Sequence, residues 1–311
     1  MRCLLRAALL PALAACAFVV QATPLRLEQV APGVYLHVGQ HKDVEDGYDG
    51  DIANIGFIVG NDAVAVIDTG GSYAVGMALK EALRAITPLP VRYVINTHVH
   101  PDHIFGNAAF IDGGAPQQRP QLIAHARLPQ ALAARREGYL RNLHKQLGDA
   151  AKGSALIGPD RTVPDRLTLD LGGRTLELRA WPIAHTDNDL TVFDSRTGTL
   201  WTGDLLFIER TPALDGDIHG WLAATEKLQA MPAALVIPGH GPLTRAKHPA
   251  LARQHDYLAA LLGDVRAGIR AGAGMTATMA TAASAERGRW QLFDAVNPRN
   301  VNYLYPILEW E

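Results

Sequence analysis

Cysteine and clustered basic residues are scarce in this 311-residue chain. Its two cysteines, Cys3 and Cys16, lie close to the N-terminus, so the rest of the chain has no thiol for a disulfide, a nucleophile or a metal ligand. A metal site in that remainder must therefore use histidine and carboxylate side chains. The formal net charge is −2 and no long basic run occurs, which disfavours nucleic acid as a partner.

The N-terminal segment has the pattern of a secretory signal. Two arginines accompany an almost wholly apolar run over residues 4–20, which ends near Ala22 in a cleavage-site pattern. The run is too short for a comfortable membrane span. We therefore predict a signal peptide over residues 1–22, one mature domain over residues 23–311 without a stable membrane span, and a periplasmic or secreted location. A lipoprotein acylated at Cys16 is the second interpretation.

Strand and helix patterns follow the same order in two halves of the chain. In the first half we expect strands at 34–38, 55–59, 63–67, 91–95 and 121–124, and helices at 73–86 and 128–147. In the second half we expect strands at 167–171, 174–180, 190–193, 199–201 and 234–237, and helices at 221–231 and, as a terminal helix, 250–271. This order predicts an α/β fold with two packed sheets and helices outside.

Four potential metal ligands fall within six residues after one of these strands: His98, His100, Asp102 and His103. In an extended segment, side chains two residues apart point to the same side, so His98 and His100 can bind one ion together. Pro101 forces a bend that can turn the next two side chains toward a neighbouring point. Imidazole and carboxylate groups are ligands for Zn²⁺ and Fe²⁺, so this spacing indicates a metal site.

Three further polar residues each follow an apolar, strand-like run beside glycine or proline: His185, Asp204 and His240. Loops at strand ends commonly present functional side chains. Taken singly, each residue could equally be a cap or a satisfied core group. Taken in order after the histidine cluster, they are candidates to complete a two-metal site.

The ordered motifs resemble those of the metallo-β-lactamase superfamily. The HxHxDH cluster is followed by a lone histidine, then Gly-Asp, then Pro-Gly-His-Gly, and residues 66–70 match the early strand motif. The resemblance implies a four-layer αββα sandwich. It also implies that His98, His100 and His185 hold one metal ion, that Asp102, His103 and His240 hold a second, and that Asp204 bridges the two.

Four short stretches resemble the quinoprotein relay system zinc metallohydrolases: residues 50–56, 98–107, 211–216 and 299–301. The name of that group associates it with periplasmic dehydrogenases that carry a quinone cofactor. A periplasmic quinoprotein is therefore an expected partner, in addition to a small-molecule substrate. The superfamily often has Gly-Gly shortly after HxHxDH, whereas Gly106-Asn107 follows here, so the match to thioesterase-type members is imperfect.

The resemblance implies a hydrolase with two Zn²⁺ per chain and a metal-bound hydroxide that attacks an ester, thioester, lactone or amide carbonyl. Asp102 is the candidate to orient that hydroxide and to shuttle a proton. Three alternatives remain: a β-lactamase of the all-histidine type, a single-iron persulfide dioxygenase, and a non-catalytic metal-binding partner of a quinoprotein. His240 and the export signal disfavour the dioxygenase, and the complete ligand set disfavours a dead site.

Several residues outside the ligand set have two interpretations. Asp68 could hydrogen-bond a ligand histidine or form a strand-end turn. Asp189 could orient His185 or be a solvated loop carboxylate. His219 could line a substrate cleft, and the polar loop that contains His41 could close over the site, although isolated surface histidines are common.

Overall fold

The computed structural model describes residues 25–311 except 44–45 and 112–118. The predicted signal peptide over residues 1–22 and the acylation site at Cys16 lie outside the described residues. In the part of the chain that is described, no helix combines the length and apolar character needed to cross a membrane.

Two β-sheets form the centre of the molecule. The first has the strand order β1-β2-β3-β4-β5-β6-β7, with bounds Glu28–Ala31, Val34–His37, Ile55–Val59, Val64–Ile67, Val91–Ile95, Gln121–His125 and Arg161–Val163. The second has the order β12-β11-β10-β9-β8, with bounds, from β8 to β12, Arg166–Asp170, Thr175–Ala180, Leu190–Asp194, Thr199–Phe207 and Leu235–His240. Strands β4 to β7 pair in parallel, as do β11 and β12, and the remaining pairs are antiparallel.

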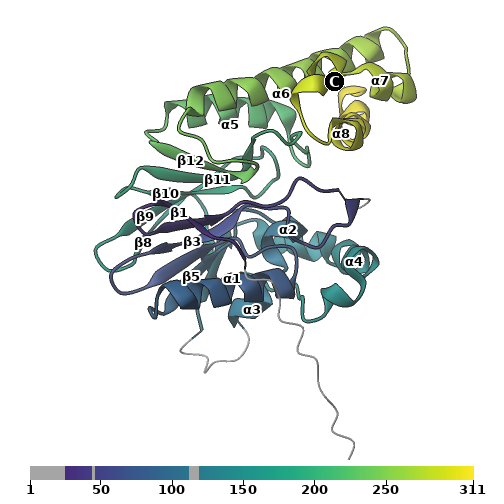
Figure 1. Cartoon of the computed structure of the whole chain (residues 1–311). Helices are drawn as coiled ribbons and strands as arrows, with labels where there is room; N and C mark the ends of the chain where they lie inside the picture. Colours follow the sequence, from purple (N-terminus) through teal and green to yellow (C-terminus); the bar gives the residue numbers. More distant parts are fainter. Residues whose placement is uncertain (1–24, 44–45, 112–118) are drawn as a thin grey trace, which may run out of the picture.

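Helices cover the outer faces of both sheets (Figure 1). The first sheet is covered by α1 Tyr73–Ile86, α2 Pro101–Ile104, α3 Asn107–Ile111 and α4 Leu128–Leu147, which a 3-10 turn extends over Gly148–Ala151. The second is covered by α5 Ile218–Ala230 and α6 Lys247–Arg270, and α7 Met275–Thr281 and α8 Phe293–Leu308 pack against α6, with a 3-10 turn at Ser284–Arg289. The predicted αββα sandwich is confirmed.

The central strands are buried on both faces because both faces are covered, and most of their residues are apolar. All four residues of β4 and all nine of β11 are buried. The sequence of a strand that is buried on both faces is a near-continuous apolar run, in which apolar residues do not alternate with polar ones. Leu36 and Trp201 belong to the core between the sheets, whereas Phe57 and Trp221 belong to the two outer cores beneath the helices.

The structure corrects the prediction at the C-terminus. The predicted terminal helix at 250–271 corresponds to α6, but α7 and α8 follow it. Pro298 and Pro306 lie inside α8, and proline ordinarily signals that a helix has ended. Strand β11 is also longer than expected and continues to Phe207, so Asp204 lies within a strand and not just after one.

Candidate metal centre

The structure brings all seven predicted residues together between the two sheets. Four come from the segment after β5, one from the loop after β9, one from β11 and one from the end of β12: His98, His100, Asp102, His103, His185, Asp204 and His240. Group one consists of His98, His100, His185 and Asp204, and group two consists of Asp102, His103 and His240. Within each group, one potential ligand atom per residue lies within 4.8 Å of the others.

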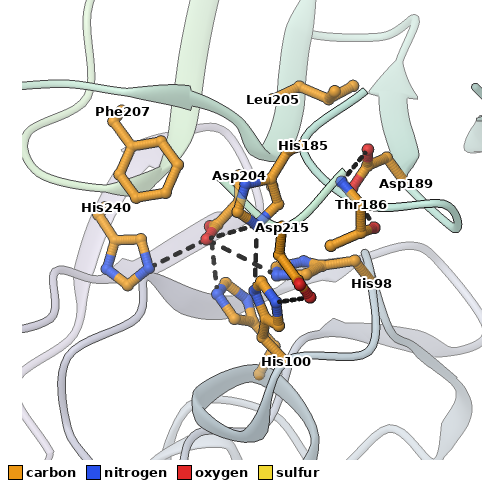
Figure 2. A network of polar contacts seen from close by, with 12 residues as sticks. His98, His100, His185, Thr186, Asp189, Asp204, Leu205, Phe207, Asp215 and His240 are labelled. Carbon is orange, nitrogen blue, oxygen red and sulfur yellow. Dashed lines mark hydrogen bonds and ion pairs between the residues drawn. The ribbon is translucent and has the colours of Figure 1, made fainter. Parts of the chain in front are cut away.

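The Asp204 carboxylate lies between the two groups (Figure 2). Its Oδ2 atom is 3.6 Å from His98 Nε2 and 3.4 Å from His185 Nε2, both in group one. The same oxygen is 3.3 Å from His240 Nε2, and Oδ1 is 3.2 Å from His103 Nε2. One carboxylate thus contacts histidines of both groups, as a residue shared by two cations would.

Hydrogen bonds to the outer ring nitrogens turn three histidines toward the centre. His103 Nδ1 donates to Asp68 Oδ2 at 2.8 Å, and His240 Nδ1 donates to the Ile52 carbonyl at 2.8 Å. His98 Nδ1 lies 3.1 Å from the Thr97 hydroxyl, which itself donates to Asp68 at 2.7 Å and therefore accepts from the ring. In His98 this leaves the Nε2 lone pair free to bind a cation, and in His103 and His240 it makes Nε2 the atom that would bind one once its proton is released.

Asp68 organises both groups, since it holds His103 directly and His98 through Thr97. It adopts a left-handed backbone conformation, with φ of 53°, at the end of β4 and also accepts from the Thr97 amide at 2.8 Å. The predicted hydrogen bond from Asp68 to a histidine of the cluster is confirmed.

Several atoms that face the centre have no hydrogen-bond partner within the described part of the chain: His98 Nε2, His103 Nε2 and Asp204 Oδ1. Leaving buried polar atoms unpaired costs about 1–3 kcal/mol each. Imidazole and carboxylate donors that converge in this way suit a Zn²⁺-type cation, so the residues fit a metal site.

The charges differ between the groups. Burial lowers the pKa of His98 well below its usual value and that of His185 to about 3, which keeps both rings neutral. For His103 burial also lowers the pKa, but the carboxylates of Asp204, Asp102 and Asp68 outweigh it and raise the pKa well above the usual value. The pKa of His240 is raised as well, since Asp204 and Asp102 outweigh the effect of burial.

Glycines in the motifs make room for the Asp204 side chain and its neighbours. A Cβ on Gly239 would overlap Asp204 Oδ1, so only glycine fits before His240. Gly203 has φ of +51°, and a Cβ there would lie 2.6 Å from Thr97 Cβ. The Gly-Asp and Pro-Gly-His motifs therefore have a steric cause.

Asn54, which sequence reasoning did not single out, ties the His240 loop to the first sheet. Its Nδ2 donates to the Pro238 carbonyl at 2.9 Å and to the Gly241 carbonyl at 2.8 Å. These bonds fix the turn on both sides of His240. The residue lies in the stretch 50–56 that carried the family resemblance, which was the available signal.

Asp215 was also missed as an individual residue. It accepts from His100 Nε2 at 3.0 Å and from Arg135 Nη2 at 3.1 Å (Figure 2). His100 Nδ1 then faces the centre, 3.0 Å from His185 Nε2. His100 therefore presents the opposite ring nitrogen from its neighbours.

Helix α8 positions the loop that carries Asp215. Asn300 Oδ1 accepts from the Leu214 amide at 2.9 Å, and its Nδ2 donates to the Pro212 carbonyl at 2.7 Å. The Tyr303 hydroxyl donates to the Gly216 carbonyl at 3.1 Å. Helix α8, which was not predicted from the sequence, thus supports the loop that carries Asp215, the residue in contact with His100.

The remaining candidates lie at different distances from the centre. Asp189 accepts from the Thr186 amide at 2.9 Å and fixes the turn after His185 without bonding to it. His219 is exposed and pairs with Glu311 at 3.4 Å, so its suggested place in a cleft has no support. His41 Nε2 lies 3.8 Å from Glu209 Oε2, so its loop reaches the segment that follows β11.

A sequence model described as the metallo-beta-lactamase superfamily matches residues 48–240, more than half of the chain and the part that contains all seven clustered residues. The chain belongs to the metallo-β-lactamase superfamily. Residues 241–311, including α6 to α8, lie outside the match to the superfamily.

Two curated relatives match parts of the chain. It is 25% identical over 166 residues to a Caenorhabditis elegans protein named beta-lactamase-like protein 2 homolog, over 53% of this chain and 47% of that protein. It is 22% identical over 214 residues to a linear primary-alkylsulfatase of a Pseudomonas species, over 58% and 40%. The chain therefore spans less than half the length of these curated relatives.

The solved structure of the sec-alkylsulfatase Pisa1 from Pseudomonas has a TM-score of 0.72 and 18% sequence identity, over 90% of this chain and 50% of that one. At this identity the likeness concerns the fold alone.

Proposed function

We propose that this chain is an exported dinuclear zinc hydrolase that cleaves an ester, thioester, lactone or amide. The observation that carries the proposal is the position of Asp204, whose two oxygens lie 3.2–3.6 Å from histidines of both groups. Group one would hold one ion, group two the second, and Asp204 would bridge them. Two-metal hydrolases place their ions about 3.5–4 Å apart, which a shared carboxylate suits.

When bound, two zinc ions would supply an activated water at neutral pH and stabilise negative charge on the substrate. The chain's own residues would orient the reactants and move the proton. Burial raises the pKa of Asp102, but His103 and His240 outweigh it and lower the pKa, so the carboxylate is ionised and can accept a hydrogen bond from the water that would be activated. Its Oδ2 lies 3.3 Å from His240 Nε2, at the centre where a proton must be taken up.

Sulfate-ester hydrolysis is a second candidate reaction. Two of the relatives are named alkylsulfatases, and the fold likeness to one of them extends over 90% of this chain. The expected quinoprotein partner gains no support from these relatives and stays a prediction. Export also stays a prediction, which mass spectrometry of the mature N-terminus would test, with cleavage after Ala22 expected.

Metal analysis with a substrate screen tests the proposal. The purified mature protein should contain about two zinc ions per chain. It should hydrolyse at least one member of a panel of esters, thioesters, lactones, β-lactams and sulfate esters. His98→Ala should lose the zinc ion of group one and, with it, turnover. His248→Ala, at an exposed histidine of α6, should keep its zinc content and its turnover. A single iron with persulfide-dependent oxygen uptake would overturn the hydrolase. Full zinc occupancy with no turnover would favour the non-catalytic partner.

A further inference from the structure

Arg210 is a buried cation that forms no ion pair with any carboxylate in the described part of the chain. It lies three residues after β11 and is only 9% exposed. Its Nη1 donates to the Lys42 carbonyl at 3.0 Å. Among the residues that the structure describes, no other acceptor bonds its guanidinium and no carboxylate forms an ion pair with it.

Other arginines show what a structural pairing looks like in this protein. Arg174, which is only 2% exposed, donates through Nε to Asp194 Oδ1 at 3.1 Å and through Nη2 to Asp194 Oδ2 at 2.6 Å. Arg135, on the other side of the metal centre, pairs with Asp215. Burying a charge without a partner is costly, so Arg210 is either kept for a ligand or is a net destabilising feature.

The backbone at Arg210 is linked to the candidate metal centre, since the Arg210 amide donates to the Ile208 carbonyl at 2.8 Å and the Ile208 amide donates to the His240 carbonyl at 3.0 Å. Burial lowers the pKa of Arg210, and the carboxylates of Asp102 and Asp204 are the strongest charges that act against this. Both carboxylates belong to the cluster. The segment that contains Lys42 contacts the same region, because His41 Nε2 lies 3.8 Å from Oε2 of Glu209, the residue before Arg210.

The net charge that the centre would have with two metal ions bound also favours an anionic ligand. Five of the seven clustered residues are histidines, which are neutral as ligands, and two are carboxylates. Two divalent cations would exceed the charge of these carboxylates even with a hydroxide between them. Arg210 adds a further positive charge beside a site that is already cationic, and such a field concentrates anions.

We propose that Arg210 binds an anionic group of the substrate, a carboxylate or a sulfate, beside the metal centre. This inference rests on the proposed function and narrows its substrate class. A guanidinium offers a fork of N–H donors that matches two oxygens of either anion. Its bond to the Lys42 carbonyl fixes one arm and leaves the others for the ligand.

A pair of substrates that differ only in charge tests the inference in the zinc-loaded protein. Mono-4-nitrophenyl glutarate and 4-nitrophenyl pentanoate share a leaving group and an acyl chain length, and the glutarate carries a terminal carboxylate. Arg210→Gln should raise KM for the glutarate ester about 10- to 100-fold, as expected for the loss of a charged hydrogen bond, and leave the pentanoate ester unchanged. 4-Nitrophenyl sulfate forms the third arm and reports the sulfate alternative.

Arg299→Gln is the matched control. Arg299 pairs with Asp43 at 2.7 Å in the same N-terminal loop region, but it is 64% exposed and already partnered. It should change neither ester. Arg210→Lys keeps the charge without the fork and should give an intermediate effect, and it remains informative if Arg210→Gln fails to fold. Equal effects on both esters, or none, would overturn the inference.

Calorimetric titration of free glutarate and inorganic sulfate into the zinc-loaded protein separates this inference from the proposed function. Wild type should bind at least one of them about 10- to 100-fold more tightly than Arg210→Gln at equal zinc content. If no member of the substrate panel is hydrolysed but this difference is seen, the hydrolase proposal fails and the anion site stands. If esters are hydrolysed and anion binding does not depend on Arg210, the hydrolase proposal stands and the anion site at Arg210 is ruled out.

Discussion

The two groups of the candidate metal centre share Asp204 but differ in charge and in support. In group one, burial lowers the pKa values of His98 and His185, and Asp215, on a loop that α8 positions, holds His100. Group two has histidines with raised pKa values beside Asp102, and its support comes from Asp68 and a backbone carbonyl. We infer that group one is ready to bind a cation at neutral pH, whereas group two must first release protons.

Removing the Asp204 carboxylate should abolish zinc binding in both groups, and with it the difference between them. Asp204→Ala leaves four histidine nitrogens without their common partner. We expect loss of both zinc ions and at least about a 1000-fold fall in turnover, since several kcal/mol of charge stabilisation leaves with the ions. Elemental analysis and steady-state kinetics measure this, with Asp256→Ala on the exposed face of α6 as the control. Retention of both ions would show that Asp204 does not bridge them.

Removing one histidine from either group should abolish zinc binding in that group alone. His185→Ala should leave about one zinc per chain in group two, and His240→Ala about one in group one, because each group keeps its other ligands. Elemental analysis of the two purified variants gives the stoichiometry. Zinc-free protein from either variant would show that the groups bind only as a unit.

Replacing a carboxylate that orients a histidine should weaken zinc binding less than removing a histidine does. Asp68 acts on His103 and, through Thr97, on His98, whereas Asp215 acts on His100. Asp68→Asn should therefore weaken zinc binding in both groups, and Asp215→Asn in group one alone, each by about 10- to 100-fold. Competition with a chromophoric chelator measures both affinities. An equal loss at both ions in Asp215→Asn would contradict the assignment of Asp215 to group one.

The contrast between Asp68 and Asp215 also shows what the sequence could predict. All seven clustered residues were predictable because each is a metal-ligand type placed beside a strand and in a known order. Asp68 was within reach because it ends the strand-like run at 63–67. The layers were predictable because buried strands are continuous apolar runs.

Asp215, Asn300 and Arg210 could not be assigned roles from the sequence, because their roles depend on distant contacts. Asp215 meets His100 across 115 residues, and Asn300 meets Pro212 across 88. The internal prolines of α8 removed the local signal for the helix that carries Asn300. Arg210 differs from the paired Arg174 only in what surrounds it, which no local pattern encodes.

The smallest expected effect is a difference in pH dependence between the groups. A raised pKa keeps His103 and His240 protonated at pH values where an ordinary imidazole, with a pKa of 6.5, would have lost its proton. Lowering the pH through the raised values should therefore weaken group two first, by about tenfold per pH unit for each proton displaced. The lowered pKa values of His98 and His185 keep group one competent to lower pH.

The single-site variants make this measurable. His185→Ala, which retains group two, should release zinc on acidification from about pH 7.5 at a higher pH than His240→Ala, which retains group one. Proton release on zinc binding, measured by calorimetry in buffers of different ionisation enthalpy, should likewise be larger for His185→Ala. Identical release curves would mean that the carboxylates around group two do not hold its histidines in the protonated form, and the contrast between the groups would reduce to their supporting contacts.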